Sequence, residues 1–193
     1  MNVINVYKTP LKIGMKWSGG DIPALSANNV EMGQINLTKE TYYGSKELYQ
    51  RWMTAGDPAK GDVLMTLEAP LGNVAQIPDD RPYILSQRVV LFKTKDELMY
   101  NTFFRYQLTY EPFQCTLLSE STGTTAKGIQ RAKLEKLLVL VPPRYNEQEL
   151  IVSKLEAIDT RICTEEQYRD KLKLQKKGLM HDLLTGKVRV KVV

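Results

Sequence analysis

Hydrophobic residues in the larger, N-terminal part of the chain, up to about Val141, occur in short runs that glycine and proline interrupt. These runs are rich in Val, Ile, Leu and Phe, a composition that favours strands when turn residues bound it. The runs follow one another too closely for helical crossovers. The pattern therefore predicts an α+β fold with a mixed, mostly antiparallel β-sheet in one globular domain. The expected strands include residues 62–67, 73–77 and 88–92.

Helical spacing of apolar residues also occurs in this part of the chain. It covers residues 45–55 and 97–110, and a shorter helix is expected at 132–138, after a polar loop at 119–131.

The C-terminal part follows a different pattern, which begins after Pro142-Pro143. From Tyr145 to Thr185 the chain has no proline, and it has no glycine before Gly178. We expect one long helix that Asn146 caps and Gly186 ends. At 1.5 Å per residue it would be about 55–60 Å long, too long to pack fully on a domain of this size. The sequence thus predicts a globular domain at 1–143 and a coiled-coil helix with a short tail at 144–193.

Apolar residues of this helix recur at alternating steps of four and three, the spacing of a coiled-coil seam with charge at its centre. The alternative is an amphipathic helix folded back on its own domain, but the expected length of the helix argues against it. The predicted dimer interface consists of Ile151, Leu155, Ile158, Ile162, Glu165, Arg169, Leu172, Lys176, Leu179 and Leu183.

The charge of the helical part predicts the direction of the partner helix. Residues 145–166 contain six acidic and two basic residues, whereas residues 167–193 contain two acidic and eight basic ones. A parallel homodimer would set like charges against each other, but an antiparallel pair centred near Gln167 would place Glu165 opposite Arg169 of its partner. In that pair, Lys176 opposite Ile158 is the one imperfect match. The partner helix can belong to an identical chain or to a different chain that supplies a companion half.

Composition narrows the possible functions. The net charge of +5 and the pI of about 9.1 suit a polyanionic partner without establishing one. With only Cys115, Cys163 and His181, a disulfide framework or a Cys/His metal site is not expected. No apolar run approaches 18 residues, so we expect a soluble cytoplasmic protein without a membrane partner.

Motifs of catalysis are missing from the sequence. No Asp or Glu has a lysine two positions later, as a common Mg²⁺ nuclease requires, and no Gly-x-Gly turn is present for a methyltransferase cofactor. The chain is therefore expected to be non-catalytic and to need no cofactor. Two alternatives stay open: a coiled-coil adaptor that does not bind DNA, and a nuclease or methyltransferase with an unfamiliar site.

Several segments together resemble the specificity subunits of type I restriction–modification enzymes. The first half of a target-recognition domain is resembled by residues 20–26, 28–30, 33–35 and 61–66, and its closing half by residues 121–129, 138–143 and 147–148. Residues 177–180 and 183–189 resemble the terminal signature of these subunits. The resemblance implies a half-length form, starting inside the first domain segment, with one target-recognition domain and one conserved coiled-coil helix. It also implies double-stranded DNA as ligand, and a methyltransferase (modification) subunit and a restriction subunit as partners.

Within that resemblance, three polar segments are candidates for DNA contact. The loop 119–131 combines glycines, hydroxyls and cations that suit phosphates and base edges. Residues 12–29 surround a double glycine, and residues 66–73 form an expected hairpin tip, where Glu68 can accept from a cytosine amino group. Residues 86–88 follow on an expected strand. The predicted DNA-binding residues are Lys12, Lys16, Ser18, Asn28, Asn29, Thr66, Glu68, Arg88, Ser121, Thr122, Thr124, Thr125, Lys127, Gln130 and Arg131.

Overall fold

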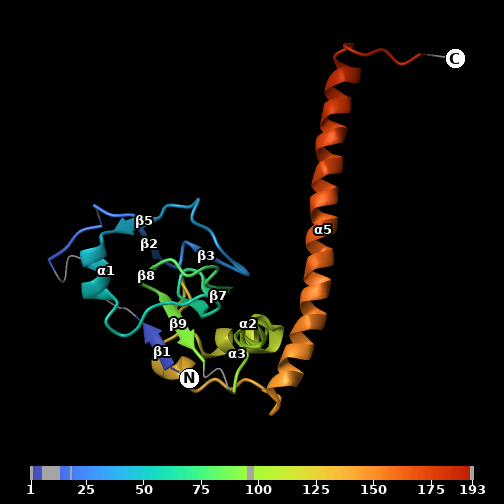
Figure 1. Cartoon of the computed structure of the whole chain (residues 1–193). Coiled ribbons are helices and arrows are strands. Elements are labelled where there is room, and N and C mark those ends of the chain that lie inside the picture. Colours follow the sequence, from blue (N-terminus) through green and yellow to red (C-terminus); the bar gives the residue numbers. More distant parts are fainter. Residues whose placement is uncertain (1, 6–13, 18, 95–97, 192–193) are drawn as a thin grey trace. The chain divides into compact units, whose positions relative to one another are not determined.

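A computed structural model describes residues 2–5, 14–17, 19–94 and 98–191 (Figure 1). The chain divides into two compact units, Met1–Glu149 and Leu150–Val193. The boundary lies inside the last helix, a few residues beyond the double proline.

The main sheet of the first unit has four antiparallel strands in the order β1-β9-β6-β7. Its central strand β6 pairs with β9 along one edge and forms a hairpin with β7 along the other. The three strands expected from the sequence are all present, with ends shifted by one or two residues. The strands are β1 (Asn2–Asn5), β6 (Val63–Leu67), β7 (Leu71–Gln76) and β9 (Val89–Lys93).

A second, smaller sheet has the order β5-β2-β8, in which β2–β5 is antiparallel and β2–β8 parallel. A two-stranded ribbon, β3–β4, is antiparallel. The expected mixed, mostly antiparallel α+β fold is confirmed. These strands are β2 (Ile22–Leu25), β3 (Val30–Glu31), β4 (Gln34–Ile35), β5 (Tyr42–Gly44) and β8 (Ile84–Leu85).

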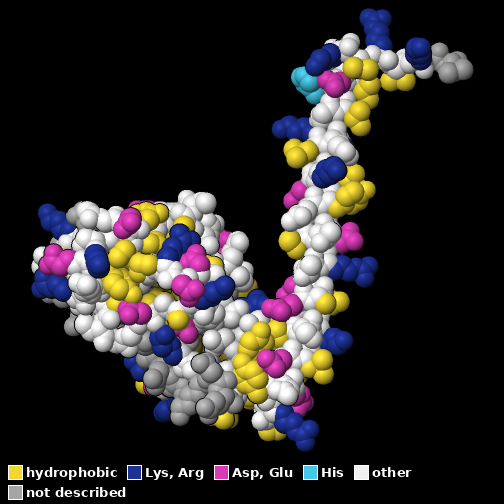
Figure 2. Space-filling model, in the orientation of Figure 1, with side chains coloured by type: hydrophobic (Ala, Val, Ile, Leu, Met, Phe, Trp, Pro, Cys, Tyr) yellow, Lys and Arg dark blue, Asp and Glu magenta, His cyan; other side chains and the backbone are white. Residues whose placement is uncertain are grey.

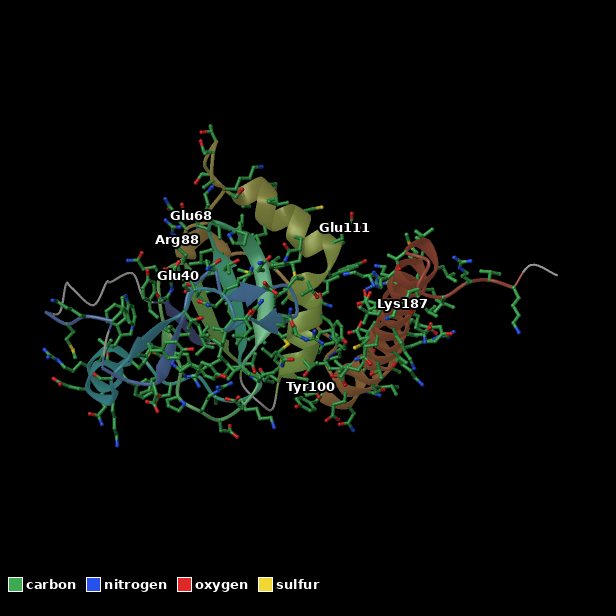
Figure 3. All side chains as sticks on the ribbon, turned by 90° about the horizontal axis from the view of Figure 1, so that it is seen from above. Glu40, Glu68, Arg88, Tyr100, Glu111 and Lys187 are labelled. Atoms are coloured by element: carbon green, nitrogen blue, oxygen red, sulfur yellow. The ribbon has the colours of Figure 1, made fainter. Side chains whose placement is uncertain are left out.

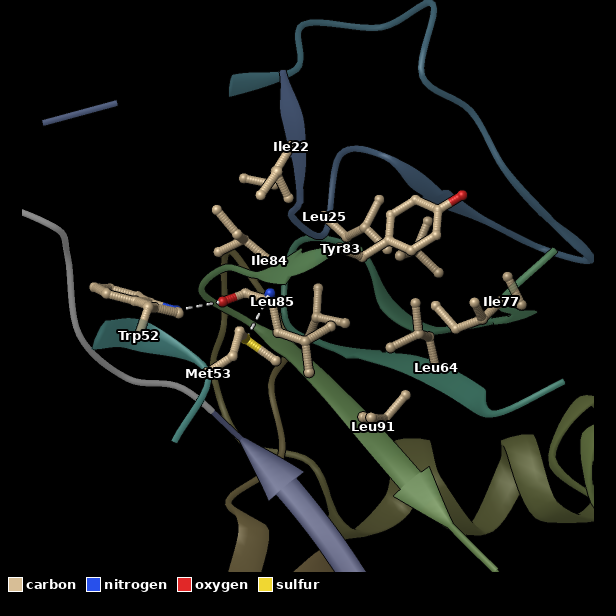
Figure 4. Packing of buried hydrophobic residues seen from close by; sticks show 14 of the residues in the cluster. Ile22, Leu25, Trp52, Met53, Leu64, Ile77, Tyr83, Ile84, Leu85 and Leu91 are labelled. Carbon is tan, nitrogen blue, oxygen red and sulfur yellow. Dashed lines mark hydrogen bonds between the residues drawn. The ribbon is translucent and has the colours of Figure 1, made fainter. Parts of the chain in front are cut away.

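Both faces of the main sheet are covered, which explains why its two central strands, β6 and β9, are almost continuously apolar. Along β6, Leu64 packs into a cluster with β2, β8 and α1 (Lys46–Trp52), seen in Figure 4, where the Trp52 indole donates to the Leu85 carbonyl at 2.8 Å. Val63 and Met65 point to the opposite face and pack against α2 (Asn101–Thr109) and α3 (Glu111–Glu120). Alternate residues thus serve two separate cores.

The helices of the domain confirm the predictions from the sequence in part. Ser45 caps α1 by accepting from the Leu48 amide at 3.1 Å, as the expected start at residue 45 requires. Helix α2 forms the centre of the expected 97–110 stretch, of which residue 97 lies outside the described residues. Helix α3 was not expected, and α4 (Arg131–Leu134) is a single turn, so the predicted helix at 132–138 is wrong in extent.

Helix α5 (Tyr145–Leu184) has the expected length of 40 residues. The predicted cap Asn146 is wrong, because the helix begins one residue earlier, where the amides of Glu147 and Gln148 donate to the Arg144 carbonyl. The predicted end is confirmed: Gly186 has a left-handed φ of 72° just after the last turn.

The predicted seam of α5 is uncovered in the single chain. Ile162 is 52% exposed and Leu179 61% exposed, and Figure 2 shows hydrophobic side chains among the charged ones along this helix. Exposed aliphatic side chains in such number along one helix are typical of an interaction surface, so the predicted dimer interface stays a prediction.

Candidate nucleic-acid interface

Three segments that are distant in sequence meet around one cavity of about 530 Å³ in the first unit. They are the tip of the β6–β7 hairpin, the turn that precedes β9, and the polar loop between α3 and α4. The cavity is lined by Leu67, Glu68, Gln87, Arg88, Thr122, Gly123, Ala126, Gly128, Ile129 and Gln130.

The polar loop is held in place by backbone hydrogen bonds. Thr122 and Gly128 exchange N–H···O bonds of 2.8 and 2.9 Å across its neck, and the Ile129 amide donates to the Leu67 carbonyl at 3.0 Å. The Ile129 side chain is buried in the core beneath α3. The loop is therefore anchored at its neck, and its polar tip, residues 123–127, faces solvent.

Two glycines of this loop lie in close contacts, of which the one at Gly123 admits no side chain. Gly123 has a φ of 110°, and a Cβ there would lie 2.2 Å from the Ala126 carbonyl oxygen. At Gly128 a Cβ would lie 3.2 Å from Cγ of Glu68, so this glycine leaves room for the stem of the glutamate. Glycine thus sets both the shape of the loop and its approach to the hairpin.

Glu68 and Arg88 form an ion pair at the mouth of the cavity, with 3.5 Å between Glu68 Oε2 and Arg88 Nε (Figure 3). Their side chains are 42% and 52% exposed. The Arg88 backbone has a φ of 65°, and its carbonyl accepts from the Leu67 amide at 2.8 Å. The pair thus joins the hairpin tip to the turn before β9.

The structure brings part of the predicted DNA-binding set together. Glu68, Arg88, Thr122 and Gln130 line the cavity, and Thr124, Thr125 and Lys127 are exposed on the same loop. Two further members of the set already have partners within the chain. The Ser121 hydroxyl donates to the Leu118 carbonyl at 2.6 Å, and the Arg131 guanidinium pairs with Glu135 at 2.7 Å.

For Asn29 and Thr66 the predicted role is wrong, because both residues are completely buried. The Asn29 side chain accepts from the Ser26 amide and donates to Thr41 Oγ1, at 3.1 and 2.8 Å, and so organises a turn. Thr66 Oγ1 accepts from the Asn73 amide at 2.9 Å inside the hairpin. Neither side chain has surface with which to reach DNA.

Of the N-terminal candidates that the structure describes, none lines the cavity. Lys12 and Ser18 lie outside the described residues. Lys16 and Asn28 are exposed but do not line the cavity. Trp17, between Lys16 and Ser18, is partly buried: its ring packs at a tilt against Trp52, with 5.9 Å between the ring centroids, beside the first hydrophobic core.

Gln87 lines the cavity although it was not among the predicted residues. The sequence placed 86–88 on a strand, where alternate side chains would face opposite sides. Instead, Gln87 and Arg88 form a turn and β9 begins at Val89, so both side chains reach the cavity. The polar triplet just before the apolar run was the available signal for this turn.

Among the described residues, no group of three or more His, Cys, Asp or Glu side chains could hold a metal ion. Within the same residues, every helix is too short or too polar to span a membrane.

The chain is similar to known specificity proteins along most of its length. The family model for the type I restriction modification DNA specificity domain matches residues 3–174. Two specificity subunits of Methanocaldococcus jannaschii, the putative MjaX subunit and the MjaVIII subunit, are 32% and 34% identical over 130 and 137 residues. These alignments cover 67% and 68% of this chain but only 29% and 32% of the relatives.

Solved structures share the fold at low sequence identity. A chain from a structural study of complex assembly and conformational transition in the type I R-M system aligns with a TM-score of 0.64 at 15% identity, covering 92% of this chain and 40% of that one. The HsdS subunit of Thermoanaerobacter tengcongensis aligns with a TM-score of 0.59, also at 15% identity, covering 94% of this chain and 41% of that one. The family match over residues 3–174 decides the assignment: the chain belongs to the type I restriction modification DNA specificity domain family.

Proposed function

We propose that this chain is the DNA sequence-recognition module of a type I restriction–modification system and binds one half of a bipartite target. The observation that carries the proposal is the cavity where the hairpin tip, the turn before β9 and the polar loop meet. Its rim offers an anion at Glu68, a cation at Arg88 and an amide at Gln130, which are side chains that read base edges in the major groove. Lys127 on the adjoining loop is exposed and suits a phosphate.

The module would be non-catalytic and would position methyltransferase and restriction subunits on the DNA. The family match and the names of the relatives, which are specificity subunits, support this division of labour. The absence of the usual nuclease and methyltransferase motifs from the sequence agrees with it.

The second unit would hold two recognition modules at a fixed separation. The exposed aliphatic side chains of α5, and the change from an acidic to a basic half along it, support an antiparallel pair with a second copy or a companion half-subunit.

The experiment is a DNA-binding titration over a range of salt concentrations, with the chain assembled with the methyltransferase subunit of its own system. Replacing Lys127 and Arg131 together by alanine should weaken binding several-fold and flatten the salt dependence, because each lost phosphate contact lowers the slope by about one. Arg51→Ala on α1, an exposed arginine that does not line the cavity, is the control and should bind like the wild type.

Unchanged affinity of the double variant would show that the loop faces away from DNA. If the wild-type complex shows no salt-dependent binding to duplex DNA, the chain is a structural adaptor and the proposal fails.

A further inference from the structure

We propose that Glu68 and Arg88 act as one unit that reads a single C·G base pair of the recognised half-site. In this arrangement Glu68 accepts a hydrogen bond from the cytosine amino group while Arg88 donates to O6 and N7 of the guanine. The inference rests on the proposed function and specifies which residues of the cavity decide the target.

The two side chains are placed for a joint contact. Glu68 comes from the hairpin tip and Arg88 from the turn before β9, yet their charged groups are 3.5 Å apart at the mouth of the cavity. About half of each side chain is exposed. The ion pair engages Nε of Arg88, whereas the outer edge of a guanidinium carries further N–H donors for a second acceptor.

The chemistry of this pair matches one kind of base pair. In the major groove a C·G pair presents a donor on cytosine, N4, beside two acceptors on guanine, O6 and N7. A carboxylate beside a guanidinium presents the complementary order, because an ionised carboxylate only accepts and a guanidinium only donates. In a T·A pair the thymine would turn an acceptor, O4, toward the carboxylate. An A·T pair keeps a donor for Glu68 and one acceptor for Arg88, but the thymine methyl takes the place of the second acceptor, guanine N7.

Backbone geometry also singles out this corner of the fold. Among the described residues, Ala69 and Arg88 are the two non-glycine residues with positive φ, at 46° and 65°. One follows Glu68 directly, and the other is the partner of Glu68. Such conformations are unfavourable for residues with a Cβ and persist where surrounding contacts fix them, here the hydrogen bond from the Leu67 amide to the Arg88 carbonyl. Strain at Arg88 and at Ala69, the residue next to Glu68, indicates that the position of this exposed pair matters for more than folding.

A purely structural ion pair does not account for the arrangement. At 3.5 Å and half exposed to water, the pair contributes little to stability. The core beneath it, formed by Leu67 and Ile129, is closed by backbone hydrogen bonds. Helix α1 carries a comparable exposed pair, Glu47 and Arg51 at 3.6 Å, which does not line the cavity and serves as a matched control.

The test compares target motifs of variants. The chain is produced in a host together with its methyltransferase subunit, and the methylated motif is read from the host genome for the wild type, Arg88→Gly, Glu68→Ala and the control Arg51→Gly. Arg88→Gly removes the guanidinium and also relieves the positive φ, so a loss of specificity cannot be ascribed to unfolding. Thermal unfolding of each variant checks this directly.

Both Arg88→Gly and Glu68→Ala should lose discrimination at the same C·G position by about ten- to a hundredfold and keep every other position of the motif. The control should reproduce the wild-type motif. The proposal is overturned if both variants keep the wild-type motif, if they relax different positions, or if Arg88→Gly weakens methylation of all sequences equally, as loss of a phosphate contact would. If the wild-type complex methylates no defined motif, the proposed function itself fails. That result is distinct from a failure of the Glu68–Arg88 proposal, which requires a defined wild-type motif that the variants leave unchanged or change in another way.

Discussion

The side chain of Gln148 is completely buried and makes three hydrogen bonds. Its Oε1 accepts from the Tyr100 amide at 2.9 Å, and its Nε2 donates to the carbonyls of Leu98 and Pro142, each at 3.1 Å. One residue thereby ties the first turn of α5 to the segment before α2. All of these groups lie within the first unit.

Replacing Gln148 by alanine should lower the free energy of unfolding by about 2–3 kcal/mol, since it leaves buried backbone groups without partners. Urea unfolding followed by circular dichroism measures the change, and the exposed neighbour Glu147→Gln serves as the control. Equal stability of the alanine variant and the wild type would mean that water replaces the side chain without cost.

Glu31 gives the domain a pH dependence in the acidic range. Hydrogen bonds from Lys39, then from Gln34 and Asn36, lower the pKa of the Glu31 carboxyl from 4.5 to about 2. A lowered pKa in the folded state stabilises the fold fully above pH 4.5, and this contribution is lost as the pH falls through about 2. The wild type should therefore lose stability relative to Glu31→Gln between these pH values, measured by chemical unfolding at several pH values. A constant difference across the range would contradict the shift.

Residue type predicted where polar chemistry lies along the chain, but it could not predict burial. Asn29 and Thr66 have the same hydrogen-bonding groups as the exposed Asn28 and Thr124. Only the fold shows that the side chains of Asn29 and Thr66 are buried and already hydrogen-bonded, within a turn and a hairpin respectively. Arg88, which was predicted to bind DNA, is exposed and lines the cavity, whereas the participation of Gln87 depends on a turn conformation that the apolar pattern did not reveal.

At the scale of elements, long and strongly patterned segments were predictable. Strand β6 and helix α5 follow from an apolar run and from the absence of proline, respectively. Strands of two or three residues, such as β3 and β8, carry too few residues to show a period and form only because neighbouring strands pair with them. Helix α3 was not predicted, although its Pro112 lies in the first turn, where proline fits a helix.

The direction of the proposed helix pair can be tested at its charged centre. In an antiparallel homodimer Glu165 faces Arg169 of the partner, and two-fold symmetry makes this contact twice. Glu165→Lys should weaken dimerisation by about three- to tenfold, and Arg169→Glu likewise, because each exposed contact is worth somewhat under about 1 kcal/mol. The double variant Glu165→Lys/Arg169→Glu should restore the dimer, since it recreates opposite charges. Analytical ultracentrifugation measures the dissociation constants.

A charge reversal outside the seam, Glu156→Lys, controls for net charge and should change dimerisation less than Glu165→Lys. If the double variant associates no better than either single one, Glu165 and Arg169 do not face each other and the antiparallel register is wrong.

At the scale of the whole molecule, the sequence shows two patterns of different period on either side of Pro142-Pro143, and the boundary between the two units lies a few residues later, inside α5. The sequence could not predict the cavity, whose three segments are brought together by the β6–β7 hairpin, by the pairing of β6 with β9 and by the anchoring of the loop through Ile129. Such a site depends on contacts between distant residues, and local patterns do not encode these contacts.

The symmetry of the proposed assembly predicts the symmetry of the DNA target. Two identical recognition domains related by a two-fold axis read the same half-site on opposite strands, so a homodimer should methylate a palindromic motif with two parts and a fixed spacer. Sequencing of methylated bases in the source genome gives this motif directly. A two-part motif with unlike halves would instead mean that α5 pairs with a companion half-subunit, because each half-site would then be read by a different domain. A continuous motif without a spacer would contradict two recognition domains held apart by α5, whichever chain supplies the second helix.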